Sequence, residues 1–339
     1  MGLLSAIYNT ALSGRRLAYN SRLKKVKKLP VKVISIGNLT LGGTGKTPAV
    51  IAVAGEAGRR GIKPCILTRG YKGALKGPVL VSSFMTDPSK ASLLGDEPVL
   101  MVNRLGDIPV VKGRNRYAGG LYALDKLGRD NIDMFILDDG FQHWGLYRDM
   151  DILLVDATNP FGNKKLFPEG RLREPLQSIR RADIIVITRT DAVNRECLSA
   201  TLQCIKQYHH NVPVYTASYK PTALVSLSGE TRGIDTLKNK KVYLVAGIAN
   251  PSYFKDLLHS LGANIVKFKI FRDHYVYTQQ DVERLGKEAE GTEIITTEKD
   301  LVKLKELKLP FNVSALGIDF DVEDDFYDIL FKRMSDDTD

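Results

Sequence analysis

The chain has 339 residues, 43% hydrophobic and 26% charged, a composition typical of a globular protein long enough for two α/β units. Its net charge of +10 suits an anionic partner, but nucleic acid is not expected because the basic residues lack interleaved aromatic side chains. The three cysteines lack a paired C-x-x-C spacing and no apolar run approaches about 18 residues, which argues against disulfides, a zinc site and a membrane-spanning helix. A reducing, cytoplasmic compartment fits this cysteine usage best.

Residues 1–30 are predicted to form an amphipathic, basic helix at a membrane surface. Apolar side chains recur at helical spacing on one face, namely Leu4, Ile7, Tyr8, Ala11 and Leu12. Seven lysines and arginines lie between these residues and Pro30, and each contributes about 1 kcal/mol of attraction to anionic lipid. The charges follow the apolar residues, so a signal peptide is not expected. The alternative is a helix that packs on its own domain and carries a solvated basic tail.

The most informative motif is the segment 33–48, in which an apolar β-like run leads into a glycine-rich turn. In such loops backbone N–H groups approach phosphate oxygens, a lysine reaches the β- and γ-phosphates, and a threonine hydroxyl holds Mg²⁺. The residues expected in these positions are Thr40, Gly42, Gly43, Thr44, Gly45, Lys46 and Thr47. Thr40 stands where the strict pattern has glycine. We interpret the segment as a nucleotide phosphate site, with an ordinary glycine-rich turn as the alternative.

Short apolar runs alternate with helical patterns along the chain. The first runs are 31–36, 64–67, 79–81, 108–111, 134–137, 152–155, 184–187 and 212–216. This alternation predicts an α/β fold with a mainly parallel, P-loop NTPase-like sheet and helices on both faces. The polar segment 226–239 is interpreted as a connection, so the predicted domains are 31–225 and a smaller α/β domain, 226–339.

The predicted second domain repeats the alternation of strands and helices. Its expected strands are 242–245, 265–271 and 293–297, and its expected helices run to about residue 261 and near 279–290. The acidic tail, 321–339, is expected to fray at its end.

Two pairs of acids stand where phosphoryl transfer needs carboxylates. Asp138 and Asp139 follow the apolar run 134–137, and ligand sites in open α/β sheets lie at that end of the strands. Neighbouring side chains on a strand point in opposite directions, so one of the two is expected to face Mg²⁺, with Asp138 the first choice. In Gly95-Asp96-Glu97-Pro98 a carboxylate is suited to take the proton of an acceptor hydroxyl, although these residues also suit a helix start.

Further polar residues near these motifs are candidates for substrate or metal contacts. Cationic candidates for a phosphorylated substrate are Arg69, Arg114, Arg116, Arg171 and Arg173. His143 is suited to contact phosphate or tune a carboxylate, or to serve as a structural donor, and Glu174 is a further candidate for the metal. The segments 188–191 and 297–300 only partly match a guanine-reading motif, and we infer no GTP from them.

The motifs together carry a family resemblance that spans Gly37 to Asp300. They are Gly37-Asn38-Leu39-Thr40, the glycine-rich turn 42–48, Thr68-Arg69-Gly70-Tyr71, Gly95-Asp96-Glu97-Pro98, Asp138-Asp139-Gly140-Phe141-Gln142-His143, Leu172-Arg173-Glu174-Pro175 and Thr297-Glu298-Lys299-Asp300. With them the chain resembles the tetraacyldisaccharide 4'-kinases, the lipid A disaccharide kinases of Gram-negative bacteria. The resemblance implies a P-loop kinase domain over 31–225. It also implies ATP and Mg²⁺, with transfer of the γ-phosphate to the 4'-hydroxyl of tetraacyldisaccharide 1-phosphate to form lipid IV-A.

The resemblance also implies roles for individual residues. Asp96 would be the catalytic base, partnered by His274 of the second domain, and their separation implies domain closure. Lys46 and Thr47 would contact phosphate and Mg²⁺, with Asp138 or Asp139 near the metal and Glu174 as a further metal-side acid. The expected substrate-binding residues are Arg69, Tyr71, Glu97, Arg116, His143 and Arg173.

The resemblance also gives residues 1–30 a role, because the acyl chains of the acceptor stay in the bilayer while its sugar enters the site. It implies a peripheral protein on the cytoplasmic face of the bacterial inner membrane, with no obligate protein partner evident. The alternative function is a soluble P-loop NTPase switch or metallochaperone that acts on a protein partner. A non-catalytic lipid-binding protein would leave Lys46 and Asp138 unexplained.

Overall fold

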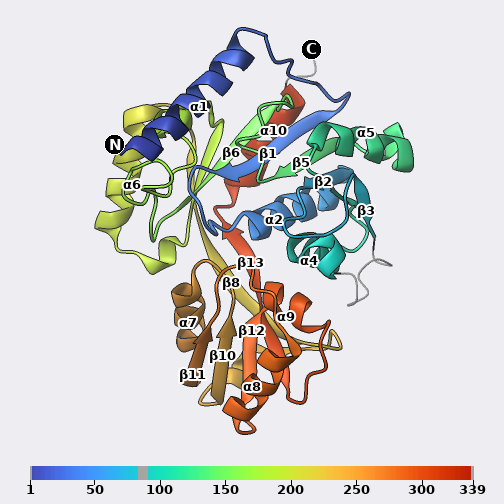
Figure 1. The fold of residues 1–339 in the computed structure, drawn as a ribbon, viewed down its shortest axis with the longest axis vertical. Coiled ribbons are helices and arrows are strands. Elements are labelled where there is room, and N and C mark those ends of the chain that lie inside the picture. The colour runs from blue at the N-terminus through green and yellow to red at the C-terminus, as the bar shows by residue number, and fades with distance from the viewer. Residues whose placement is uncertain (1, 83–90, 337–339) are drawn as a thin grey trace.

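A computed structural model of the protein describes residues 2–82 and 91–336 and has an α/β fold (Figure 1). In this part of the chain 13 strands form one sheet, in the order β11-β10-β12-β13-β8-β7-β6-β1-β5-β2-β4-β3, with β9 paired to β8. The strands are β1 (Lys32–Asn38), β2 (Pro64–Thr68), β3 (Val79–Val81), β4 (Val110–Lys112), β5 (Met134–Asp138), β6 (Met150–Asp156), β7 (Ile184–Thr188), β8 (Val214–Ser226), β9 (Thr231–Gly233), β10 (Lys241–Ala246), β11 (Asn264–Ile270), β12 (Glu293–Thr297) and β13 (Val313–Val322). The helices are α1 (Leu3–Asn20), α2 (Lys46–Arg59), α3 (Ala91–Leu94), α4 (Asp96–Leu105), α5 (Arg116–Leu127), α6 (Arg195–Tyr208), α7 (Pro251–Ser260), α8 (Gln279–Ala289), α9 (Glu298–Leu304) and α10 (Asp325–Asp336).

The strands of the sheet are mostly parallel, which confirms the predicted fold class. Among the described residues the antiparallel pairs are β3 with β4, β8 with β13 and β8 with β9. Strand β1 lies between β5 and β6, parallel to both. The strand that leads into the glycine-rich loop therefore ends beside the strand that ends in Asp138.

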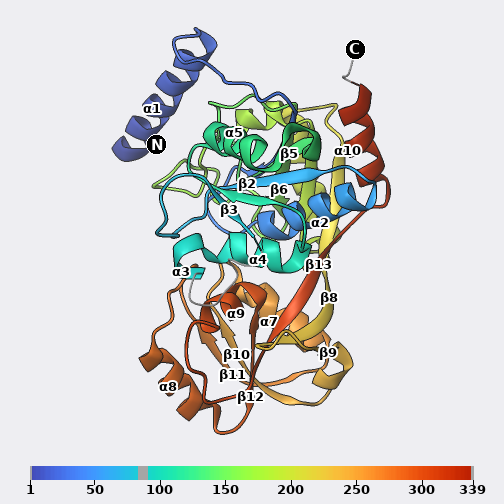
Figure 2. The same cartoon turned by 90° about the vertical axis from the view of Figure 1, so that its right-hand side faces the viewer.

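Helices cover both faces of the central strands because the strand side chains alternate in direction. On β5, Met134 and Ile136 pack in one core cluster with residues of α2 and α4. Phe135 and Leu137 of the same strand pack in another cluster that includes Ala123 of α5. Figure 2 shows α5 and α4 on opposite sides of β2.

Strands β8 and β13 join the larger part of the molecule, which contains β1–β7, to the smaller part, which contains β10–β12 (Figure 1). Their pairing is irregular between Leu316 and Ile318, where Pro221 lies opposite Ile318. Proline has no N–H for the ladder and is tolerated in a sheet at such irregularities.

The segment predicted as a connection has regular structure in part. It contains β9 and a short 3₁₀ helix over Ile234–Leu237, and β8 ends at Ser226, where the connection was expected to begin. Strand β13, which the sequence analysis did not predict, returns to β8 from the smaller part. The division into 31–225 and 226–339 stays a prediction.

The two ends of the described chain are helical. In α1, the side chains of Ser5 and Tyr8 donate to main-chain carbonyls of Leu166 and Arg173, at 3.1 and 2.9 Å. In α10, Phe326 and Leu330 are buried, so the acidic tail is a docked helix up to Asp336. The expected fraying at the end of the tail lies outside the described residues. Among the described helices, none has the length and apolar character needed to cross a membrane.

Candidate active site

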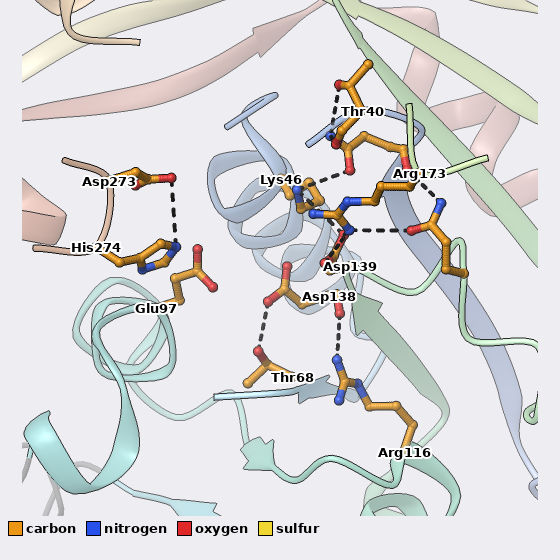
Figure 3. A network of polar contacts seen from close by, with 12 residues as sticks. Thr40, Lys46, Thr68, Glu97, Arg116, Asp138, Asp139, Arg173, Asp273 and His274 are labelled. Carbon is orange, nitrogen blue, oxygen red and sulfur yellow. Dashed lines mark hydrogen bonds and ion pairs between the residues drawn. The ribbon is translucent and has the colours of Figure 1, made fainter. Parts of the chain in front are cut away.

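The glycine-rich loop joins the carboxyl end of β1 to the first turn of α2. Gly45 has φ +86° and leads directly into Lys46, the first residue of α2. The Lys46 ammonium donates to Asn38 Oδ1 at 3.2 Å and lies 3.5 Å from Asp139 Oδ1 (Figure 3). The loop thus has the form that phosphate binding requires, a glycine-rich turn at a helix N-terminus with a lysine beside it.

The conformation at Gly45 leads to a prediction about nucleotide binding. A Cβ atom at this position would lie 1.4 Å from the Tyr219 hydroxyl, and φ +86° is strained for any residue with a side chain. Gly45→Ala is expected to displace the loop and to weaken ATP binding at least about tenfold, since about 1.4 kcal/mol changes affinity tenfold. Isothermal titration with ATP measures this.

Gly61→Ala is a matched control, because Gly61 has φ +76° but nothing within 4 Å of an added Cβ. It keeps the backbone strain without disturbing the loop. Equal ATP affinity of the Gly45→Ala and Gly61→Ala variants would contradict the phosphate-binding role of this turn.

The two acids at the end of β5 have different surroundings, although Asp139 lies beyond the strand, with φ +53°, and both line the same cleft. Asp138 is buried, and its Oδ2 accepts a hydrogen bond from the Thr68 hydroxyl at 2.8 Å. Burial, together with the nearby charge of Glu97, raises the pKa of Asp138 to about 7. Burial acts in the same direction on Asp139, but the charges of Lys46 and Arg173 outweigh it and lower its pKa to about 2. Asp139 is therefore the ionised partner of the two cations.

The site has oxygen donors that suit Mg²⁺. Among the described residues no ion pair involves Asp138, although Lys46 is near enough for its charge to act on this carboxyl group, and a divalent ion would add positive charge beside it. Within the described residues no three His, Cys, Asp or Glu side chains form a group that could hold a metal alone. Mg²⁺ usually takes one or two carboxylates together with substrate phosphates, so this donor set fits a nucleotide-bound ion. Thr47, in the first turn of α2, lines the same cleft as Asp138, and its hydroxyl is of a type that also suits Mg²⁺.

A second polar cluster brings together residues of the two parts of the molecule. Asp96 is the first residue of α4, and its Oδ2 lies 3.2 Å from Nδ1 of His274, which follows β11. Burial alone would raise the pKa of Asp96, but the hydrogen bond from His274 and the charge of Lys299 lower it to about 2. The structure thus joins the two residues that the family resemblance paired.

A cleft of about 910 Å³ connects the two polar clusters. Residues from both parts of the molecule line it, among them Gly42, Gly43, Gly45, Lys46, Thr47, Arg69, Tyr71, Glu97, Asp138, Asp139, Arg173, His274 and Lys299. Tyr71 also packs on His274, with ring centroids 4.9 Å apart. Asp96 lies beside this cleft with 8% of its surface exposed.

Two residues predicted for the site, Arg116 and Glu174, have protein partners, and a third, His143, is neutral. Arg116 is buried and donates to the carbonyls of Gly113 and Asp138, at 2.7 and 3.1 Å (Figure 3). Glu174 lines the cleft and pairs with Arg181 at 2.8 Å, and its metal-side role stays a prediction. Burial, helped by the charge of Arg116, lowers the pKa of His143 to about 4, so this imidazole is neutral near pH 7.

Two residues of the cleft received no role in the sequence analysis. Tyr219 of β8 lies against Gly45, but its distance along the chain from the loop leaves no sequence signal. Lys299 lies in the segment 297–300, which partly matches a base-reading motif and is one of the motifs of the family resemblance, but neither pattern predicts a role for the lysine. The sequence signal for Lys299 was therefore a motif to which no chemical role had been assigned.

Comparison with known proteins agrees with this geometry. The family model described as Tetraacyldisaccharide-1-P 4'-kinase matches residues 1–335. Relatives named tetraacyldisaccharide 4'-kinase from Halothermothrix orenii and Syntrophus aciditrophicus are each 37% identical to the chain, and the matches cover 95% and 98% of it and 88% and 92% of the relatives. The crystal structure of the "apo" form of LpxK from Aquifex aeolicus in complex with ATP has 34% sequence identity and a TM-score of 0.76, over 98% of this chain and 97% of that one. The chain therefore belongs to the tetraacyldisaccharide-1-P 4'-kinase family.

Proposed function

We propose that this protein transfers the γ-phosphate of ATP to the 4'-hydroxyl of tetraacyldisaccharide 1-phosphate, forming lipid IV-A in lipid A biosynthesis. The observation that carries the proposal is the pair formed by the buried carboxylate of Asp96 and the imidazole of His274, at the cleft that Lys46 also lines. Phosphoryl transfer to an alcohol needs these two parts together, a phosphate site and a proton acceptor.

In the proposed reaction the acceptor hydroxyl attacks the γ-phosphorus, the new O–P bond forms, the bond to the β,γ-bridging oxygen breaks, and ADP leaves. Asp96 accepts the hydroxyl proton, and its pKa of about 2 keeps it ionised at neutral pH. Such a weak base suits a loose transition state, in which the proton leaves late and positioning supplies most of the catalysis. Lys46 and the loop N–H groups balance the phosphate charge.

Mg²⁺ would neutralise the β- and γ-phosphate oxygens when bound, with Thr47 and Asp138 as its protein donors. Asp139 would hold Lys46 in place from one side, since it lies 3.5 Å from the ammonium and is itself anchored by Arg173 at 2.8 Å. Arg69 and Tyr71, which line the same cleft, would contact the acceptor.

The acceptor specificity tests the proposal. Incubation with Mg-ATP and tetraacyldisaccharide 1-phosphate in detergent micelles is expected to give one product, phosphorylated at the 4' position by mass spectrometry and ³¹P NMR. A 4'-deoxy acceptor is expected to bind without reacting. Phosphorylation of the 4'-deoxy acceptor would place the transfer on another hydroxyl and overturn this assignment.

We also propose that α1 attaches the protein to the cytoplasmic face of the bacterial inner membrane. Leu4, Ile7 and Leu17 are 65%, 58% and 67% exposed, although they are large apolar side chains. The adjacent part of the same helix face contributes Tyr8 and Leu12 to the cleft, so lipid at the exposed residues would lie next to the proposed acceptor site. Exposed apolar residues flanked by basic ones favour an interfacial helix.

The membrane proposal predicts the behaviour of a double variant, Leu4→Glu with Ile7→Glu. Each substitution removes an exposed apolar side chain whose burial in lipid contributes about 1.5–3 kcal/mol, so binding to vesicles containing anionic phospholipid is expected to fall at least about tenfold. Vesicle sedimentation measures this. Leu121→Glu, on α5, is the matched control because Leu121 is also exposed, at 44%. If the double variant binds vesicles as well as the Leu121→Glu control, α1 is not the attachment site.

A further inference from the structure

The segment Thr297-Glu298-Lys299-Asp300 supports the Asp96–His274 pair with three consecutive side chains. Glu298 forms an ion pair with Arg104 of α4, at 3.0 Å, which ties α9 to the helix that begins with Asp96. Asp300 is fully buried and accepts a hydrogen bond from the N–H of Gly247, at 2.9 Å. The Gly247 carbonyl in turn accepts from the N–H of His274, at 3.2 Å. The contacts of this segment therefore hold Asp96 and His274 in place, and they do not indicate a base-reading role.

Lys299 makes the direct contact with the imidazole. Its ammonium donates to Glu97 Oε1 at 3.0 Å, lies 3.9 Å from Asp96 Oδ2, and lies 3.3 Å from His274 Nε2. An ammonium group has three donors and no acceptor. The contact with Nε2 is therefore a hydrogen bond only if Nε2 carries no proton and accepts.

The protonation state of Nε2 determines whether Nδ1, the other ring nitrogen, carries a proton. In a neutral imidazole one nitrogen carries the proton and the other accepts, so an accepting Nε2 places the proton on Nδ1. Nδ1 is the atom that lies 3.2 Å from Asp96 Oδ2. Burial alone would lower the pKa of Lys299, but the charges of Glu97 and Asp96 raise it above its ordinary value, which keeps the ammonium charged.

The other groups around His274 do not compete for Nε2. Asp273 Oδ2 lies 4.0 Å from Nε2, the contact drawn in Figure 3, which is too long for a hydrogen bond. Lys72 donates to the main-chain carbonyl of His274 at 2.7 Å, not to the ring. The Tyr71 ring packs against the imidazole.

We propose that Lys299 is a positioning residue that fixes the tautomer of His274, so that the imidazole presents its Nδ1–H to Asp96. This inference deepens the proposed function and rests on it for its catalytic meaning. The N–H orients the Asp96 carboxylate toward the acceptor hydroxyl. Without Lys299 the ring is free to adopt the Nε2–H tautomer, which leaves Asp96 Oδ2 without the imidazole donor.

Nitrogen NMR of the histidine rings tests the tautomer directly. The chain has five histidines, so ¹⁵N-histidine labelling gives a simple spectrum, and His274→Gln identifies the signals of His274. The wild-type protein at pH 7.5 is expected to show a protonated Nδ1 and a proton-free Nε2 at His274. Lys299→Met is expected to convert a measurable share to the Nε2–H form or to imidazolium, whereas Lys299→Arg, which keeps a donor, retains the wild-type form.

Lys308→Met is the matched control, because Lys308 follows the same helix and is exposed. A protonated Nε2 at His274 in the wild-type spectrum would overturn the proposal without any variant, as would a Lys299→Met spectrum identical to that of Lys308→Met. These readouts do not depend on kinase activity, so they stand apart from a failure of the proposed function itself.

Kinetics then separates positioning from substrate binding. Lys299→Met is expected to lower kcat at least about tenfold with KM for ATP and for the lipid acceptor nearly unchanged, because a positioned base supplies roughly 10²–10⁴-fold. Lys299→Arg is expected to recover much of this loss. A raised KM for either substrate with kcat unchanged would make Lys299 a substrate-binding residue and contradict the proposal.

Discussion

Asp96→Asn is expected to lower kcat by roughly 10³-fold while the dissociation constant of ATP changes less than about twofold. The substitution keeps the shape of the side chain, and the amide oxygen can still accept one of the two hydrogen bonds that the carboxylate accepts, at Oδ2 from His274 Nδ1 (3.2 Å) and at Oδ1 from the N–H of Glu97 (3.0 Å). The fold is therefore preserved, but an amide cannot take the proton of the acceptor hydroxyl. Single-turnover transfer and ATP titration measure the two effects.

The control for this variant is Asp107→Asn, because Asp107 is an exposed aspartate beyond the end of the helix that Asp96 begins. It is expected to keep wild-type kcat. Turnover of Asp96→Asn within a few-fold of this control would remove Asp96 from the role of proton acceptor, even if His274 remained essential.

Lys46→Met is expected to lower kcat by roughly 10²–10³-fold and to weaken ATP binding, which distinguishes it from Asp96→Asn. The variant removes the Lys46 ammonium group, which lies 3.5 Å from Asp139 and 3.2 Å from Asn38, directly after the glycine-rich loop. Asp139 keeps its ion pair with Arg173, so the turn after β5 retains a partner. Steady-state kinetics and ATP titration are the measurements.

Lys206→Met, on the exposed surface of α6, controls for the loss of a lysine elsewhere. If Lys46→Met matched it in both ATP affinity and kcat, the glycine-rich loop would not be the nucleotide site.

The strands and the phosphate loop were predictable because their signals are local. A run of Val, Ile and Leu residues marks each parallel strand. The residues of the phosphate site are also contiguous, because the lysine and the threonine directly follow the glycine-rich loop. Strand β13 was missed because its pattern changes along its length. Val313 and Ala315 are buried, but Asp319 and Asp321 alternate with apolar residues further along, where the strand passes from one part of the molecule to the other.

The apolar side of α1 was predicted only as a single face, and the structure divides it. Tyr8 turns toward the protein and bonds to the carbonyl of Arg173, whereas Ile7, its neighbour, is 58% exposed. Helical spacing identifies residues on adjacent parts of a helix surface, but which part meets the protein depends on tertiary packing.

The candidate site depends on contacts that sequence spacing cannot express. Asp96 and His274 are 178 residues apart, and they meet because α4 packs on α9 across the two parts of the molecule. Only the family resemblance paired them in advance. Conversely, Glu174 was suggested by residue type, and its ion pair with Arg181 has no signature in the sequence.

The central claim is tested most directly by following labelled γ-phosphate from Mg-ATP in detergent micelles that contain tetraacyldisaccharide 1-phosphate. The proposed function predicts label on the lipid, in amounts that match the ADP formed and that require both Lys46 and Asp96. Release of the label as inorganic phosphate, with an unlabelled lipid, would contradict it and favour an NTPase that drives a protein partner.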